Sequence, residues 1–264
     1  MSINHEIKGL EIVPGGITAP RGFQAAAAAA EIRYPDRPDL ALIYSEVPAV
    51  AAAVYTRNKV QAAPLIVSRE HLANGQAQAV VINAGIANAA TGQQGLADAR
   101  QMAYLTAEAL QIAPEDVVVA STGVIGQFLP MERVEKGIQQ AAAQLSPNGG
   151  AEAAQAIMTT DTRRKEIAVK LNIGGCPVTI GGMAKGSGMI HPDMATMLGF
   201  ITTDAAIEPA VLRQALKASI NRSFNLVTVD GDTSTNDMVL VLANGLADNL
   251  RIAGAGPDLA AFQA

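Results

Sequence analysis

Residues 165–185 constrain the fold more than any other part of this chain. They read KEIAVKLNIGGCPVTIGGMAK, two runs of alternating apolar and polar residues joined at Gly174 and Gly175. Alternation with a period of two is typical of strands, and the two glycines favour the tight turn of a β-hairpin. Because a hairpin is antiparallel, this stretch argues against a strictly parallel, Rossmann-type sheet.

Strands and helices alternate irregularly along the rest of the chain. Short apolar runs predict strands at residues 25–30, 40–46, 49–56, 77–85, 116–126 and 237–245, with another that begins near Met197. Helical spacing of apolar residues predicts helices at 63–75, 96–110, 131–145 and 208–222. We expect 40–46 and 49–56 to be two neighbouring strands divided by a proline. The predicted fold is mixed α/β (α+β), a layered mixed sheet covered by helices.

Composition narrows the classes of protein. The chain of 264 residues is long enough for one large domain or two smaller ones, and 49% of its residues are hydrophobic and 16% charged. A net charge of −5 argues against a nucleic-acid or anionic-membrane surface. No apolar run approaches the roughly 18 residues of a membrane helix, and residues 1–10 lack the apolar core of a secretory signal. We therefore expect a cytoplasmic protein.

The sequence does not match three common kinds of site, namely a phosphate-binding loop, an EF-hand and a nucleophile activated by histidine. In GGMAKGSG, Lys185 precedes Gly186, whereas a phosphate-binding loop places its lysine after the glycine. The acidic stretch VDGDTSTND at 229–237 lacks the residue order of an EF-hand and its closing glutamate, and we interpret it as a turn with capping side chains. With three histidines and no G-x-S-x-G motif, a histidine-assisted nucleophile has little support.

A threonine after the glycine-rich loop suggests another chemistry. Thr196 lies between small and apolar residues in AKGSGMIHPDMATMLGF. A threonine needs no histidine if it becomes a chain terminus, because its own α-amine, with a pKa of roughly 8, accepts the proton. The chain would have to cut itself by attack of the Thr196 hydroxyl on the Ala195 carbonyl, followed by hydrolysis of the ester. On these grounds alone self-cleavage is only one interpretation, and an ordinary threonine in a strand is far commoner.

Motifs along nearly the whole chain resemble those of one known family. They are GGMAKGSGMIHPDMATMLGFITTDA, GGITAPRGF, VINAGIANAATG, ASTGVIG, IMTTDTR and NRSFNLVTVDGDTSTND. In content and order they resemble the ornithine acetyltransferases of arginine biosynthesis, also called bifunctional glutamate N-acetyltransferases. The resemblance implies a self-processing fold similar to that of the N-terminal-nucleophile hydrolases.

The resemblance also implies where the chain is cut. Cleavage between Ala195 and Thr196 would leave an α-chain of residues 1–195 and the start of a β-chain at 196–264. The two chains would stay together, as a heterotetramer with two of each.

Individual residues take roles from the same resemblance. Thr196 would be the nucleophile, and Thr122 and Gly123 would form the oxyanion hole. Thr159, Lys185 and Thr196 would contact the substrate, with Lys185 holding an α-carboxylate.

The implied reaction is a ping-pong transfer. Thr196 would take the acetyl group from N-acetylornithine and pass it to glutamate, without a metal or organic cofactor. Whether acetyl-CoA is also an acetyl donor is left open. Family members continue beyond the position of residue 264, so the chain is expected to lack a C-terminal part. The alternatives are an N-terminal-nucleophile aminopeptidase or amidase, and an inactive fragment.

Overall fold

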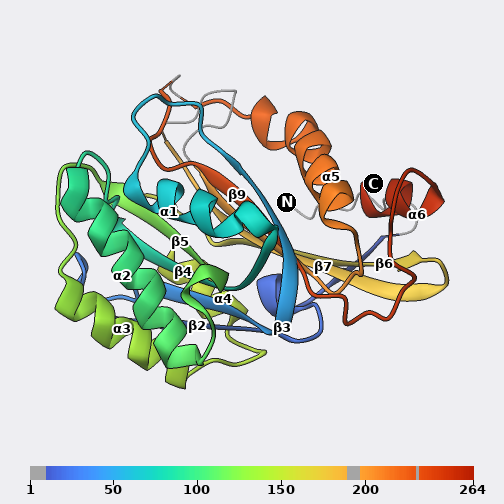
Figure 1. Ribbon diagram of the computed structural model, residues 1–264, viewed down its shortest axis with the longest axis horizontal. Coiled ribbons are helices and arrows are strands. Elements are labelled where there is room, and N and C mark those ends of the chain that lie inside the picture. Colours follow the sequence, from blue (N-terminus) through green and yellow to red (C-terminus); the bar gives the residue numbers. More distant parts are fainter. Residues whose placement is uncertain (1–9, 189–196, 230–231) are drawn as a thin grey trace.

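Among the described residues, nine strands form one mixed sheet with helices on both sides (Figure 1). The computed structural model describes residues 10–188, 197–229 and 232–264. The strands are β1 (Glu11–Val13), β2 (Phe23–Ala28), β3 (Leu40–Tyr55), β4 (Gln76–Ile86), β5 (Val117–Val124), β6 (Lys165–Ile173), β7 (Cys176–Lys185), β8 (Leu198–Thr203) and β9 (Met238–Ala243). The helices are α1 (Ala63–His71), α2 (Gly92–Leu110), α3 (Met131–Ala143), α4 (Gly150–Ala156), α5 (Pro209–Arg222) and α6 (Pro257–Phe262).

The sheet order is β1-β6-β7-β8-β9-β3-β4-β5, and β2 pairs with β3 beside this path. The β4–β5 and β8–β9 pairs are parallel, and the other pairs are antiparallel. The expected mixed sheet is therefore confirmed, and so is the hairpin, as β6 and β7. The predicted helices are present, although α2 begins four residues earlier than expected, at Gly92.

The prediction of two strands at 40–46 and 49–56 is wrong, because both belong to the single long strand β3. Its pairing with β4 shifts register between Tyr44 and Ala49, which marks an irregularity around Pro48. Proline has no N–H to donate to a neighbouring strand, so it fits where the ladder is interrupted. Because such a register irregularity bends a strand, β3 bends there and continues to Tyr55.

This bend divides the sheet into two halves. The first part of β3 pairs with β2 and β4, whereas Val50–Tyr55 pairs with β9. Side chains from both halves form one buried cluster, the inner core, to which α1 and α4 also contribute. From the strands it includes Ile43, Val80, Ile82, Val118, Ala120, Met183, Leu198, Phe200, Met238 and Leu240. The inner faces of the two halves therefore pack against one another.

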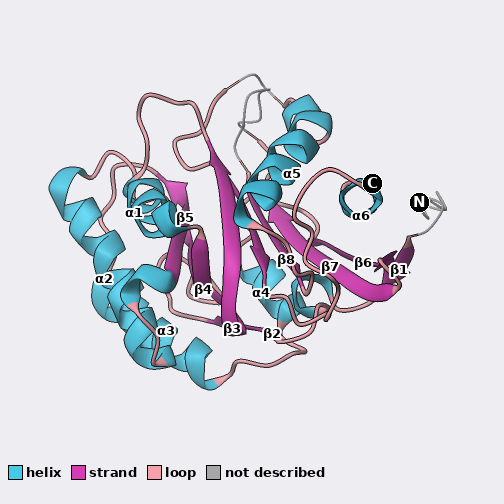
Figure 2. Ribbon diagram, turned by 45° about the vertical axis from the view of Figure 1, so that its right-hand side comes forward, coloured by secondary structure: helices cyan, strands magenta, loops and turns pink. Residues whose placement is uncertain are grey.

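Helices cover the outer face of each half (Figure 2). α2 and α3 pack on the half that contains β4 and β5, through residues such as Met102 and Ile138. α5 and α6 pack on the other half, where Leu212 and Leu216 of α5 share a buried cluster with Val239 and Val241 of β9. The result is four layers, with helices outside and two sheet halves inside.

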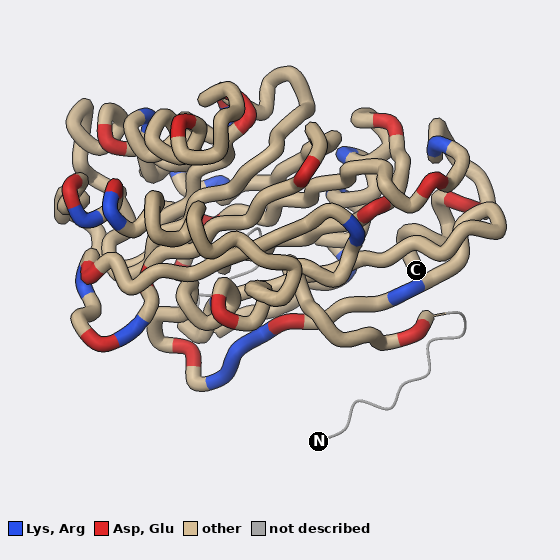
Figure 3. Tube along the Cα trace, turned by 90° about the horizontal axis from the view of Figure 1, so that it is seen from below, with Lys and Arg blue, Asp and Glu red and all other residues tan. Residues whose placement is uncertain are grey.

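Charged residues of both signs are spread over the outer loops and helices, whereas the strands through the middle are mostly uncharged (Figure 3). None of the helices in the described ranges is both long enough and apolar enough to cross a membrane.

The inner core predicts where stability resides. Phe200 is almost fully buried in it, so Phe200→Ala should lower the free energy of unfolding by about 3–5 kcal/mol. Leu250 is 83% exposed, and Leu250→Ala should change stability by less than about 0.5 kcal/mol. Urea unfolding measures both, in chains that carry Thr196→Ala so that the predicted cut cannot interfere. Equal effects of the two substitutions would contradict the assignment of this core.

Candidate active site

Alternation along β5 and β7 carries polar side chains to the edge of the inner core. Val118 and Ala120 of β5 point into this core, and Thr122 continues the same face at the end of the strand. In β7, Met183 points into the core, and Lys185 ends the strand two residues later. Four strands lie between β5 and β7 in the sheet order, but the bend in β3 brings the two ends together.

A buried hydrogen bond joins these strand ends. Lys185 Nζ donates to Thr122 Oγ1 over 2.8 Å, and the two residues are 4% and 6% exposed. Because the hydroxyl oxygen accepts this bond, its hydrogen can donate to a further acceptor. Burial lowers the pKa of Lys185, and the charge of Asp161, together with that of Asp237 when it is ionised, opposes that shift.

Gly123 lies where two backbones approach closely. It stands beside Gly85 in the parallel β4–β5 pair. Its φ is 135°, a conformation that residues with a side chain rarely adopt. A Cβ atom at this position would lie 2.1 Å from the carbonyl carbon of Gly85. Both the conformation and the space therefore require glycine at the residue after Thr122.

Asn236 fixes the start of β9 against the end of β5. It lies two residues before Met238 of the inner core and is itself buried. Its Nδ2 donates to the carbonyl oxygens of Ser121, over 2.9 Å, and of Ala87, over 2.7 Å. A single amide group thus provides hydrogen bonds to two backbone carbonyl groups from another part of the sheet, and one of them belongs to the residue directly before Thr122.

Asp237 binds the backbone next to Thr196. Its Oδ1 accepts a hydrogen bond from the Met197 N–H over 2.9 Å. The residue is 1% exposed, and Oδ2 has no hydrogen-bond partner within the described residues. Burial raises the pKa of Asp237 from 3.8 to about 8, and the Met197 hydrogen bond, the Ser234 hydroxyl and the Lys185 charge offset only part of that rise.

Asp161 connects Thr159 with the loop that follows β7. Its Oδ2 accepts a hydrogen bond from the Thr159 N–H over 3.4 Å, and its Oδ1 accepts one from the Gly186 N–H over 2.8 Å. Lys165 forms an ion pair with the same carboxylate. Burial would raise the pKa of Asp161, but the hydrogen bonds from Lys165 and Gly186 hold it below its usual value. Thr159 therefore lies close to the residue that follows Lys185.

The predicted nucleophile and cut lie outside the described residues. Ala195 and Thr196 fall between residue 188, where one described range ends, and Met197, where the next begins. Of the other predicted site residues, Thr122, Gly123 and Lys185 come together, and Asp161 joins Thr159 to the loop next to them.

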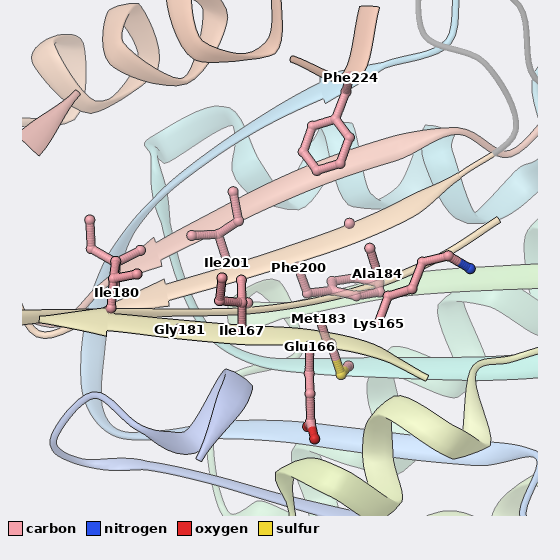
Figure 4. Close-up of a pocket in the computed structure, with 13 residues that line it drawn as sticks. Lys165, Glu166, Ile167, Ile180, Gly181, Met183, Ala184, Phe200, Ile201 and Phe224 are labelled. Atoms are coloured by element: carbon pink, nitrogen blue, oxygen red, sulfur yellow. The ribbon is translucent and has the colours of Figure 1, made fainter. Parts of the chain in front are cut away.

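A groove of about 450 Å³ lies on the opposite face of β6, β7 and β8. Figure 4 shows Ile180, Ile201 and Phe224 turned into it, while Met183 points the other way, toward the inner core. Lys185 shares the Met183 side of β7, because residues two apart on a strand face the same way. The groove is therefore separate from the hydrogen-bonded site.

Sequence reasoning missed the roles of Asp161, Asn236 and Asp237. We predicted that side chains of 229–237 cap nearby backbone groups. Asn236 instead binds backbone carbonyls more than a hundred positions away. The available signal was a pair of polar residues directly before the fully apolar run 238–243.

In the described ranges, no cluster of three or more His, Cys, Asp or Glu side chains is arranged to hold a metal ion.

The layered fold is that of the Ntn hydrolases. The l-aminopeptidase d-ala-esterase/amidase of Ochrobactrum anthropi, a variant of that fold, matches with a TM-score of 0.52 over 89% of this chain and 77% of its own. The identity is 18%, so this likeness concerns the fold alone. The expected N-terminal-nucleophile-like fold is confirmed.

The chain belongs to the ArgJ family, whose family model matches residues 24–264. It is 61% identical to the arginine biosynthesis bifunctional protein ArgJ of Symbiobacterium thermophilum, over 96% of this chain and 63% of that protein. The protein of the same name from Bacillus subtilis is 52% identical, over 95% of this chain and 61% of its own length. The chain thus spans about three fifths of these relatives, and the family expected from the motifs is confirmed.

Two solved structures of the family are also similar. ArgJ of Bacillus halodurans has a TM-score of 0.66 and 44% identity, over 71% of this chain and 97% of its own. The ornithine acetyltransferase of Mycobacterium tuberculosis, solved in complex with ornithine, has a TM-score of 0.64 and 40% identity, over 69% of this chain and 98% of its own.

The contact between Gly123 and Gly85 can be tested against a nearby glycine. Gly123→Ala should strongly destabilise the end of β5, because its Cβ would overlap the Gly85 backbone. Gly126 also has a positive φ, of 73°, but nothing lies within 4 Å of a Cβ there. Gly126→Ala should therefore cost only about 1–2 kcal/mol, from the backbone conformation. Urea unfolding of both variants in the Thr196→Ala chain measures the difference, and equal losses would contradict the close approach.

The raised pKa of Asp237 predicts a pH-dependent stability. Between pH 4 and about 8 the folded chain keeps a proton on Asp237 that the unfolded chain has lost, so the free energy of unfolding falls as the pH rises. Asp237→Asn removes this titration. The free energy of unfolding of the chain with Asp237, minus that of the Asp237→Asn chain, should therefore decrease from pH 5 to pH 8. Urea unfolding measures it, with Thr196→Ala in both chains. A constant difference would show that Asp237 titrates normally.

Proposed function

We propose that this chain is the self-processing part of an acetyltransferase that moves an acetyl group from N-acetylornithine to glutamate. The observation that carries this proposal is the buried hydrogen bond from Lys185 to Thr122, beside Gly123. It places a hydroxyl donor, a glycine backbone and a cation at the edge of the inner core. Membership of the ArgJ family supports the class of reaction.

Thr122 and Gly123 would stabilise the oxyanion that forms when an acyl group is attacked. Lys185 already donates to the Thr122 oxygen, so the Thr122 hydrogen is directed to another acceptor. A developing oxyanion is such an acceptor, and losing one donor of this kind typically costs a factor of roughly 100–1000 in rate. Gly123 would add its backbone N–H, and its positive φ sets the direction of that group.

Lys185 and Thr159 would contact the substrate. N-Acetylornithine and glutamate both carry an α-carboxylate, which an ammonium group binds. A carboxylate held by Lys185 would lie next to the proposed oxyanion hole, because its Nζ is 2.8 Å from Thr122 Oγ1. Thr159 would reach the same region from the loop that Asp161 joins to Gly186.

Thr196 would act as nucleophile after the chain has cut itself at Ala195. The products would be an α-chain of residues 1–195 and a β-chain that begins at Thr196, assembled as a heterotetramer. The solved Bacillus halodurans chain supports this division, because 97% of it aligns with only 71% of the present chain. That solved chain is therefore close in length to residues 1–195 and far shorter than the curated relatives.

The reaction would proceed in two half-reactions. The Thr196 hydroxyl attacks the acetyl carbonyl, the amide C–N bond breaks, and ornithine leaves with the proton on its amine. The glutamate amine then attacks the acetyl ester, the ester bond breaks, and Thr196 regains its hydroxyl proton. No metal or organic cofactor enters either step, and acetyl-CoA would be an alternative acetyl donor. We place this reaction in the cytoplasm.

Intact mass of the purified chain tests the cut. The wild-type chain should separate into pieces of residues 1–195 and 196–264, and Thr196→Ala should stay whole. Incubation with N-acetylornithine should then add one acetyl group to the 196–264 piece, and glutamate should remove it as N-acetylglutamate.

The other outcomes would overturn the proposal in distinct ways. A cut chain that hydrolyses peptides and transfers no acetyl group to glutamate would be an aminopeptidase or amidase. A wild-type chain that stays whole would be an inactive fragment. A Thr196→Ala chain that is still cut would point to a contaminating protease.

A further inference from the structure

Asp237 is a buried carboxyl group for which the reaction above has no use. It lies directly before β9, next to Asn236, whose side chain has a clear structural role in binding Ser121 and Ala87. Asp237 instead directs Oδ1 to the N–H of Met197, over 2.9 Å. That nitrogen belongs to the peptide bond between Thr196 and Met197, so the carboxyl binds the first peptide group after the proposed cut.

We propose that Asp237 is a positioning residue for the Thr196 nucleophile, which it holds through the Thr196–Met197 peptide bond. The inference rests on the proposed function, because it assigns a role in the same self-cleavage. Self-cleavage requires the Thr196 hydroxyl to meet the Ala195 carbonyl within a short stretch of backbone. Fixing the adjacent peptide group restricts that backbone, and errors of about 1 Å in such placement can cost roughly a hundredfold in rate.

The Oδ2 atom of Asp237 indicates the protonation state in which this carboxyl group acts. Oδ2 is buried and has no hydrogen-bond partner within the described residues. A buried carboxylate with an unsatisfied oxygen is costly, whereas a neutral carboxyl carries its proton there. The raised pKa of Asp237 agrees with a neutral group at pH 7. We therefore assign the positioning role to the protonated carboxyl, with Oδ1 as the acceptor of the Met197 hydrogen bond.

The groups around Asp237 favour its ionised form, because the Met197 N–H, the hydroxyl and N–H of Ser234 and the Lys185 charge all lower its pKa, but burial outweighs them. From β7, the Lys185 ammonium is the charge that acts on it, and Asp161 and Lys165 act in turn on Lys185. From β3, the contact is the N–H of Thr56, which donates to the Asp237 backbone oxygen and leaves the side chain untouched.

Asparagine is a close mimic of a neutral aspartic acid, and this makes the inference testable. Its oxygen can accept the Met197 hydrogen bond, and its neutral NH₂ group takes the place of the Oδ2 hydroxyl. Asp237→Asn should therefore cut itself at pH 7 within a few-fold of the wild-type rate. Asp237→Ala, which offers no acceptor, should cut at least about tenfold more slowly.

The pH profile separates positioning from simple structural support. The rate of self-cleavage, followed by intact mass from pH 6 to 9.5, should fall in a step near pH 8 in the wild-type chain, because Asp237 then loses the proton of the form that positions Thr196. Asp237→Asn should lack that step. Asp98, a buried carboxylate on α2 that accepts a hydrogen bond from Gln94, is the matched control, and Asp98→Asn should leave the profile unchanged.

Several results would overturn the inference while leaving the proposed function intact. One is a wild-type rate in Asp237→Ala. Another is an asparagine variant as slow as the alanine variant, and a third is an unchanged step near pH 8 in Asp237→Asn. Urea unfolding of each variant in the Thr196→Ala chain excludes a slow cut caused by unfolding. A wild-type chain that is never cut would overturn both proposals together.

Discussion

The bend in β3 is the constraint on which the rest of the structure depends. One strand supplies hydrogen bonds to β2 and β4 with its first part and to β9 with its last. Because the direction changes within one strand, two sheet halves can stack and bury apolar side chains between them. Without this bend, β5 and β7 would lie at distant positions in a single sheet. The contact between Lys185 and Thr122 is therefore a product of the fold as a whole.

The inner core also explains why the polar residues of the site are ordered. Thr122 and Lys185 each extend an apolar strand face by one more alternate position, as Thr122 follows Ala120 and Lys185 follows Met183. Both side chains are almost fully buried at the strand ends, so they form a hydrogen bond with one another and not with water. Low solvent exposure is also what shifts the pKa values of Lys185 and Asp237 in opposite directions. Packing and electrostatics at this site thus have one origin.

Local patterns predicted the elements well but could not predict how distant elements meet. The hairpin at Gly174 and Gly175 followed from alternation and turn residues, both of which are short-range signals. The continuity of β3 through Pro48 was missed, because a proline usually separates strands unless a partner tolerates a break in register. Thr122, Gly123 and Lys185 were found through family motifs. The contacts of Asp161 with Gly186 and of Asp237 with Met197 form only when distant segments come together, and no local spacing encodes them.

The order of the strands has a consequence for a chain that is cut before Thr196. β8 would belong to the second piece, yet it lies between β7 of the first piece and β9, and β9 in turn pairs with β3. Pieces interleaved in this way remain one folded unit after the cut. Unfolding would then also be a dissociation, since two chains would have to meet again to refold. The thermal midpoint of the processed protein would depend on its concentration, as it does for an obligate dimer.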